Sequence, residues 1–147
     1  MTSAAEVLLV DDNPADSDLT CEVLTGGREQ LQVRMVSDGV EAFAYLHHLG
    51  KYSGAALPDL ILLDLNLPRR DGRAVLADIK QNASLRKIPV VVFTTSQAAQ
   101  DIARSYELGA NSYVTKPGNL RDFVSAVKSL EEFWLRFATL PVEENHD

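Results

Sequence analysis

The sequence predicts a doubly wound α/β domain, in which helices cover both faces of a parallel β-sheet. Three short apolar runs, at residues 7–10, 60–63 and 90–93, lack the alternation of a half-buried strand. Strands without alternation are buried on both faces, as in a parallel sheet covered by helices. Helical segments lie between these runs, and strand–helix alternation implies right-handed crossovers within one sheet.

The first two strand–helix units have recognisable ends. After the strand at 7–10, Asn13 can cap a helix with Pro14 at its first position, where a missing N–H does no harm. Gly26 and Gly27 would end this helix. A second strand at 33–36 contains Arg34, which suits the edge of a sheet. The next helix is predicted to begin with a capping box and to end at a glycine; these residues are Asp38, Glu41 and Gly50.

The remaining units follow the same rule. Asp71 and Gly72 precede the helix after the strand at 60–63, and Ser96 or Gln97 precedes the helix after the strand at 90–93. Gly109 is a predicted left-handed helix stop. A fifth strand is expected at 112–114, and Asn119 opens the last helix.

Size and charge limit the classes of function. The 147 residues suit one domain over 1–147, with flexible tails expected at 1–5 and 142–147. The net charge of -7 opposes binding to nucleic acid and to anionic lipid. The run at 7–10 is too short for a signal peptide or a membrane span, and the lone Cys21 excludes an internal disulfide. We therefore expect a cytoplasmic protein without a nucleic-acid or membrane partner.

Polar residues follow the strands at their carboxyl ends. In an open parallel sheet these ends face one crevice, where ligands bind. The predicted crevice therefore holds carboxylates, a hydroxyl and an ammonium group. The residues that supply them are Asp11, Asp12, Asp64, Thr94 and Lys116.

This set of side chains favours phosphoryl chemistry with a metal ion. Three clustered carboxylates repel one another unless a cation is present, and oxygen ligands favour Mg²⁺ over zinc. An oxygen of Asp64 can attack phosphorus and form an acyl phosphate. Mg²⁺ and Lys116 would neutralise the charge on the phosphoryl oxygens, and Thr94 can donate a hydrogen bond to one of them.

Four motifs, at residues 10–13, 63–72, 93–96 and 113–117, together resemble the receiver domain of two-component response regulators. The resemblance spans nearly the whole chain. It implies a CheY-like, flavodoxin-like fold with a five-stranded sheet in the order 2-1-3-4-5. It also implies a phosphoacceptor protein and not an enzyme, with a sensor histidine kinase as the phosphoryl donor.

The resemblance also implies a role for each site residue. Asp64 would accept the phosphoryl group, and Lys116 would pair with the acyl phosphate. Asp11 and Asp12 would bind Mg²⁺ together with Asp64 and the backbone carbonyl of Asn66. A further pair, Thr94 and Tyr113, would couple phosphorylation to a change in the surface formed by the fourth helix, the fifth strand and the last helix.

Several other segments point to one group within this family. The loop at 50–58 and the stretches at 67–73, 105–108, 132–134 and 139–141 resemble the regulators that serve bacterial and cyanobacterial phytochromes. This resemblance implies that the partner kinase is a phytochrome.

Three other functions compete with this interpretation. A phosphatase of the haloacid dehalogenase type also forms an aspartyl phosphate, but it needs a second Asp where this chain has Asn66. A flavodoxin-like carrier would place the FMN phosphate against Asp11 and Asp12, whose charges oppose it. A pseudo-receiver that only binds partners remains open, although the full set of acceptor residues is present.

The last helix is longer than a small sheet requires. Its apolar residues keep helical spacing over about five turns, and the early ones suit the core. The later ones predict an exposed apolar patch, hence a homodimer or partner surface, with an intramolecular cap as the alternative. These later residues are Phe133, Trp134, Leu135, Phe137 and Leu140.

Overall fold

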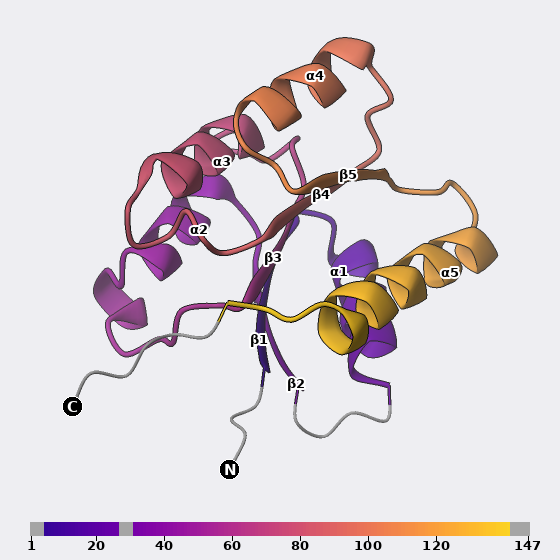
Figure 1. Cartoon of the computed structure of the whole chain (residues 1–147), viewed down its shortest axis with the longest axis horizontal. Helices are drawn as coiled ribbons and strands as arrows, with labels where there is room; N and C mark the ends of the chain where they lie inside the picture. Colours follow the sequence, from indigo (N-terminus) through magenta and orange to yellow (C-terminus); the bar gives the residue numbers. More distant parts are fainter. Residues whose placement is uncertain (1–4, 27–30, 142–147) are drawn as a thin grey trace.

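The computed structural model describes residues 5–26 and 31–141, and its centre is a five-stranded parallel β-sheet (Figure 1). The order β2-β1-β3-β4-β5 confirms the expected topology. The strands are β1 (Ala5–Val10), β2 (Leu31–Val36), β3 (Leu60–Leu63), β4 (Val90–Thr94) and β5 (Ser112–Thr115).

Helices cover both faces of this sheet. The helices α1 and α5 lie on one face, α2 and α3 lie on the other, and α4 lies beside the edge strand β5 (Figure 1). No helix in the described part of the chain has both the length and the apolar character needed to cross a membrane. The helices are α1 (Pro14–Thr25), α2 (Gly39–Leu46), α3 (Gly72–Gln81), α4 (Ala99–Glu107) and α5 (Leu120–Leu130), with a 3-10 turn η1 (Gly50–Tyr52) and a π-helix η2 (Glu131–Phe137).

The sheet divides the core into two layers. Leu8 and Val10 of β1 pack toward α2 and α3, whereas Val7 and Leu9 pack toward α1 and α5. All four side chains are buried. Alternate residues of a strand point to opposite faces, and here both faces are covered. This packing is why the strand sequences are continuously apolar.

The predicted helix caps are confirmed for four helices. In each, the side chain of the cap residue accepts a hydrogen bond from a backbone N–H in the first turn, which would otherwise lack a partner. The capping residues are Asn13, Asp38, Asp71 and Asn119, with donor–acceptor distances of 3.0, 2.7, 3.0 and 2.9 Å.

The predicted start of α4 is wrong. The helix begins at Ala99 after Ala98, which has no capping side chain. Ser96 lies in the preceding loop, where its hydroxyl donates to Asp101 at 2.6 Å. The Ser96 hydroxyl, which was expected to cap this helix, therefore bonds to a side chain in the first turn of the helix instead.

Two other boundaries differ from expectation. The helix α2 ends at Leu46, before the predicted stop at Gly50, because His48 already adopts a left-handed φ of 57°. The strand β1 begins at Ala5, in the expected tail, because Ala5 pairs with Leu31 of β2. The other tail predictions, at 1–4 and 142–147, and the predicted role of Gly27 lie outside the described residues.

Beyond Leu130 the last helix widens into the π-helix η2. Its final bond runs from the Ala138 N–H to the carbonyl of Phe133 at 2.6 Å, five residues back. Phe133 and Phe137 are exposed, as expected. Trp134 and Leu135 instead pack partly against the core beside α1 and α5. The exposed apolar patch is therefore smaller than predicted.

Candidate functional site

The carboxyl ends of the strands bring the predicted residues together. Asp11 follows β1 and Asp64 follows β3, and these two strands pair in register up to Val10 and Leu63. The backbone N–H of Asp64 donates to the carbonyl of Val10 at 2.9 Å. Asp11 and Asp64 therefore leave adjacent strands at the same level of the sheet, with both side chains buried.

Lys116 lies at the centre of this cluster. Its backbone N–H donates to the carbonyl of Thr94 at 2.6 Å, which fixes the residue at the end of β5. Its ammonium nitrogen lies 2.7 Å from Asp11, 3.0 Å from Asp16 and 3.2 Å from Asp64. Asp16 was not predicted as a site residue. Its position three residues after the cap Asn13 is a usable signal, since the first turn of α1 follows Asp11 directly.

The electrostatics of the cluster follow from this geometry. Burial raises the pKa of Asp11, and the hydrogen bond from Lys116 opposes that shift without cancelling it. Burial alone would favour neutral Lys116, but the bond to Asp11 and the charge of Asp64 raise the pKa of Lys116 above its ordinary value. The ammonium group therefore stays charged at neutral pH.

The remaining negative charge suits a divalent cation. Asp11, Asp12 and Asp64 each offer a carboxylate oxygen, and these oxygens lie within 4.8 Å of one another. Within residues 5–26 and 31–141, the ion pairs of Asp11, Asp16 and Asp64 all go to the ammonium group of Lys116. A set of oxygen donors with excess negative charge fits a hard ion such as Mg²⁺ or Mn²⁺.

The loop after β3 approaches the same point. The backbone N–H of Asn66 donates to Asp64 at 3.2 Å, and the Asn66 side chain is exposed. Gly72 at the start of α3 packs so closely that an added Cβ would lie 2.3 Å from the carbonyl oxygen of Asp64. In the sequence, Gly72 marks the start of a helix and belongs to the motif at 63–72. The structure shows that it permits close packing directly behind Asp64.

The two predicted switch residues lie in neighbouring strands, Thr94 at the end of β4 and Tyr113 within β5. Thr94 is fully buried, and its hydroxyl has no hydrogen-bond partner. The hydroxyl of Tyr113 donates to the carbonyl of Ser96 in the loop after β4, at 2.9 Å. A buried hydroxyl without a partner is costly, so that of Thr94 is available to an acceptor that enters the site.

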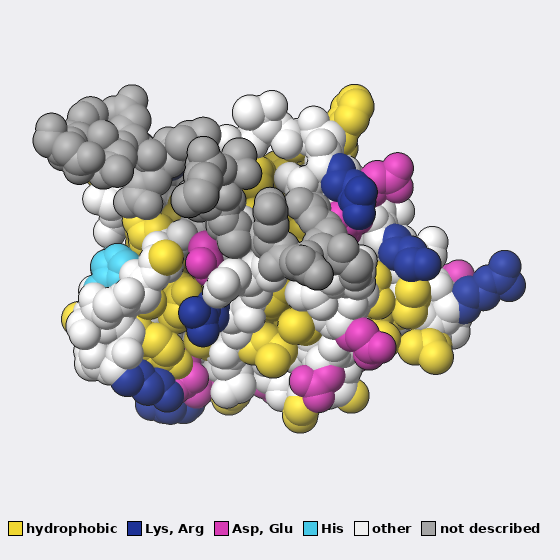
Figure 2. All heavy atoms as spheres, turned by 90° about the horizontal axis from the view of Figure 1, so that it is seen from below, with side chains coloured by type: hydrophobic (Ala, Val, Ile, Leu, Met, Phe, Trp, Pro, Cys, Tyr) yellow, Lys and Arg dark blue, Asp and Glu magenta, His cyan; other side chains and the backbone are white. Residues whose placement is uncertain are grey.

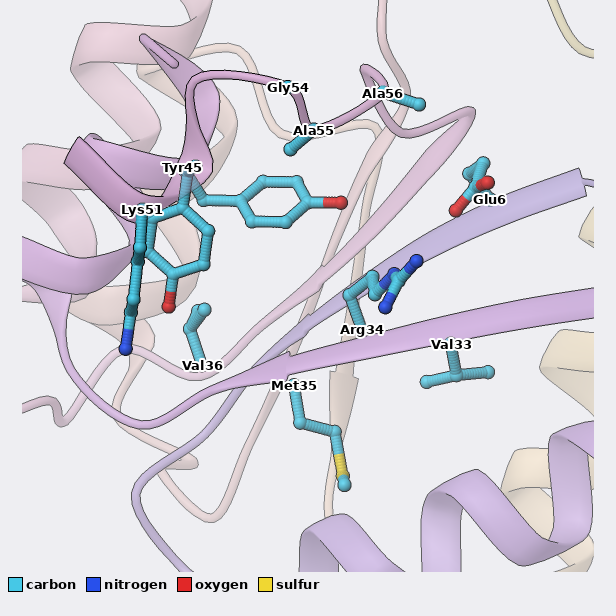
Figure 3. Close-up of a pocket in the computed structure, with 11 residues that line it drawn as sticks. Glu6, Val33, Arg34, Met35, Val36, Tyr45, Lys51, Gly54, Ala55 and Ala56 are labelled. Atoms are coloured by element: carbon cyan, nitrogen blue, oxygen red, sulfur yellow. The ribbon is translucent and has the colours of Figure 1, made fainter. Parts of the chain in front are cut away.

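Another cavity lies away from this cluster. It measures about 760 Å³ and lies beside the edge strand β2, where Glu6, Arg34 and Tyr45 line it (Figure 3). A smaller cavity of about 210 Å³ opens beside Asp11 and Asp12. We assign the site to the end of the sheet beside the smaller one, because Asp11 and Asp12 of the carboxylate cluster line it.

The opposite end of the molecule has no comparable concentration of charge in view. Figure 2 looks from below onto the side where β1 starts, and acidic, basic and apolar side chains are interspersed on that face. The acidic cluster lies at the other end of the strands, where β1 and β3 finish.

This arrangement suits phosphoryl transfer to a carboxylate. An oxygen of Asp64 would be the acceptor, and Lys116 with a bound cation would neutralise the transferred group. Asn66 occupies the position of the general acid that a haloacid dehalogenase phosphatase needs. The site therefore favours formation of an aspartyl phosphate over its rapid turnover.

Comparison with known proteins agrees with this chemistry. A family model described as the response regulator receiver domain matches residues 7–128. The response regulator Rcp1 of Synechocystis sp. is 50% identical over 135 residues, which cover 92% of each chain.

Solved structures give the same result. The phosphorylated cyanobacterial phytochrome response regulator RcpA superimposes with a TM-score of 0.93 at 50% identity, over 95% of this chain and 100% of its own. The Mn²⁺-bound form of Rcp1 superimposes with a TM-score of 0.91 at 48% identity, over 94% of this chain and 99% of its own.

Proposed function

The chain belongs to the response regulator receiver family, and from this we propose that it carries a signal as a phosphoryl group on Asp64. The donor is a phosphorylated histidine of a sensor kinase, and the reaction requires Mg²⁺. The observation that carries the proposal is the buried Lys116 ammonium, 3.2 Å from Asp64 within a cluster of carboxylates. A cation held so close to an acceptor carboxylate can neutralise a phosphoryl group there.

The transfer exchanges one bond to phosphorus for another. An oxygen of Asp64 bonds to phosphorus while the phosphorus–nitrogen bond of the phosphohistidine breaks. The imidazole keeps the electron pair of that bond and takes a proton from water. Mg²⁺, held by Asp11, Asp12, Asp64 and the backbone carbonyl of Asn66, would stabilise the charge on the phosphoryl oxygens.

The phosphoryl group changes the shape of the protein through Thr94 and Tyr113. The unpaired hydroxyl of Thr94 donates to a phosphoryl oxygen and draws the end of β4 toward Asp64. Tyr113, whose hydroxyl holds the loop after β4, changes its rotamer in response. The surface formed by α4, β5 and α5 then shifts between two conformations that already exist in equilibrium.

The kinase partner is a phytochrome of the bacterial type. Two relatives that match almost the whole chain, Rcp1 and RcpA, support this assignment, since RcpA is described as a phytochrome response regulator. The protein acts in the cytoplasm, where the histidine kinase domain of such a sensor lies. It does not turn over a substrate, although it assists its own phosphorylation and dephosphorylation.

Two copies of the chain associate through the last helix and its neighbouring surface. The exposed apolar side chains of Phe133, Phe137 and Leu120 support this, with 49%, 81% and 67% of their surface accessible. Trp134 packs against the ring of Phe133 from the core side and would stiffen that surface. Burial of these side chains between two copies would remove apolar surface from water.

Transfer from a phosphorylated phytochrome kinase tests the proposal. We expect rapid, Mg²⁺-dependent transfer to the parent chain and none to Asp64→Asn. The matched control is Asp78→Asn, because Asp78 is a half-buried carboxylate that pairs with His47 at 2.8 Å, away from the site. Equal labelling of the Asp64→Asn variant and the parent would refute the assignment.

A further inference from the structure

A chain of polar contacts joins the two loops that border the acidic cluster. Arg73 in the first turn of α3 donates to Asp101 of α4 at 2.5 Å. The other oxygen of Asp101 accepts a hydrogen bond from the hydroxyl of Ser96 at 2.6 Å. The carbonyl of Ser96 accepts a third bond, from Tyr113 at 2.9 Å. Ser96 is therefore held through its side chain and through its backbone.

Each end of this chain lies next to a residue of the phosphorylation site. Gly72, directly before Arg73, packs against the carbonyl of Asp64. Ser96 lies two residues after Thr94, whose buried hydroxyl has no partner. The pair of Arg73 and Asp101 therefore links the segment behind the acceptor carboxylate to the loop that follows Thr94.

The contacts oppose the movement that a phosphoryl group would cause. A phosphoryl oxygen on Asp64 would accept a hydrogen bond from Thr94 and draw the end of β4 toward the site. The hydroxyl of Ser96 would have to leave Asp101 for this loop to move, and Arg73 fixes the position of Asp101. An interaction present in one conformation and weakened in the other shifts the equilibrium between them.

We propose that Arg73 and Asp101 are positioning residues that hold the loop after β4 in its resting place and so weaken binding of a phosphoryl group at Asp64. The inference rests on the proposed function. Neither residue touches the phosphoryl group, and both act through Ser96. The two side chains are only 28% and 20% exposed, so solvent screens this pair less than a fully exposed one.

The test is the affinity for beryllofluoride, a stable phosphoryl mimic, in the presence of Mg²⁺. We expect Asp101→Asn and Arg73→Gln each to bind the mimic about three- to tenfold more tightly than the parent. Asp101→Asn keeps an acceptor for Ser96 and removes only the charge. Ser96→Ala, which cuts the chain at its next contact, should tighten binding similarly.

A double variant separates positioning from general stability. If the two residues act as one pair, Arg73→Gln with Asp101→Asn should bind within about twofold of either single variant. Arg104→Gln is the matched control, because Arg104 pairs with Glu107 on the same helix at 3.5 Å and both side chains are more than half exposed. Its affinity should equal that of the parent.

The outcomes are distinct. Unchanged or weaker affinity in Asp101→Asn and Arg73→Gln would overturn the inference, even if their melting temperatures fall. A double variant whose gain in affinity equals the product of the two single gains would also overturn it. Failure of the parent itself to bind the mimic, with binding equally absent in Asp64→Asn, would instead count against the proposed function.

Discussion

Gly72→Ala gives the sharpest structural prediction, because it adds one methyl group behind the acceptor carboxylate. The new Cβ would lie 2.3 Å from the carbonyl oxygen of Asp64 and 2.6 Å from the Cα of Leu65, whereas ordinary contacts begin at 3.4 Å. Both neighbours are backbone atoms, so no side-chain rotation relieves the overlap. The start of α3 or the end of β3 must therefore move by about 1 Å.

The expected cost has two parts. Overpacking of this kind typically destabilises by about 1–3 kcal/mol, and more where backbone must move. Alanine is a better helix former than glycine by about 0.8–1.0 kcal/mol, which offsets part of that cost. We expect a net loss of about 1–3 kcal/mol in the free energy of unfolding, together with weaker Mg²⁺ binding because Asp64 is displaced.

Urea unfolding and a Mg²⁺ titration of the same samples measure both effects. Gly54→Ala is the control, since an added Cβ at Gly54 meets no atom within 4 Å. It should stay within about 0.5 kcal/mol of the parent. A Gly72→Ala variant as stable as the Gly54→Ala control, with unchanged Mg²⁺ affinity, would refute the reasoning.

Three further predictions concern the charges and hydroxyls of the site. Lys116→Met should lower the free energy of unfolding by about 3–5 kcal/mol at neutral pH, because it leaves buried carboxylates unpaired. Loss of Lys116 should raise the pKa of Asp11 in the folded protein further above 3.8. The variant then loses stability as the pH rises through that pKa. In urea unfolding, the difference in stability between the variant and the parent should therefore be smaller in acid than at neutral pH. Mg²⁺ at about 100 times its Kd should stabilise the parent by about 2.7 kcal/mol in a thermal shift assay, and Asp12→Asn should abolish most of that gain. Tyr113→Phe should cost about 0.5–1.5 kcal/mol in urea unfolding, through loss of the bond to Ser96, while Asp64 still accepts phosphate; no loss would contradict that bond.

The sequence predicts those site residues whose position depends only on the strand that they follow. Asp11 and Asp64 directly follow buried strands, and parallel pairing places such residues together. Lys116 follows from the same rule at the end of β5. These predictions needed only the apolar runs and the direction of the strands.

Other features depend on contacts between distant segments. The pairing of Arg73 with Asp101 spans 28 residues, and no local pattern predicts it. The hydroxyl of Ser96 bonds to the same Asp101 and does not cap the helix α4. Asp16 joins Lys116 only because the first turn of α1 points back toward the end of β5.

The last helix shows a different limit of prediction from sequence. The spacing of apolar residues predicted a regular helix through Phe137, but η2 takes wider turns. In that geometry Trp134 faces the core while Phe133 faces solvent. Helical periodicity alone assumes one constant twist, so it misplaces side chains where the twist changes.

Identification of the phosphorylated residue tests the central claim most directly. The purified chain would be incubated with acetyl phosphate and Mg²⁺, and the modified peptide would be mapped by mass spectrometry. We predict one phosphoryl group per chain, on Asp64, and none when Mg²⁺ is removed by chelation. Modification of any residue other than Asp64, or equal modification without the metal ion, would contradict the account.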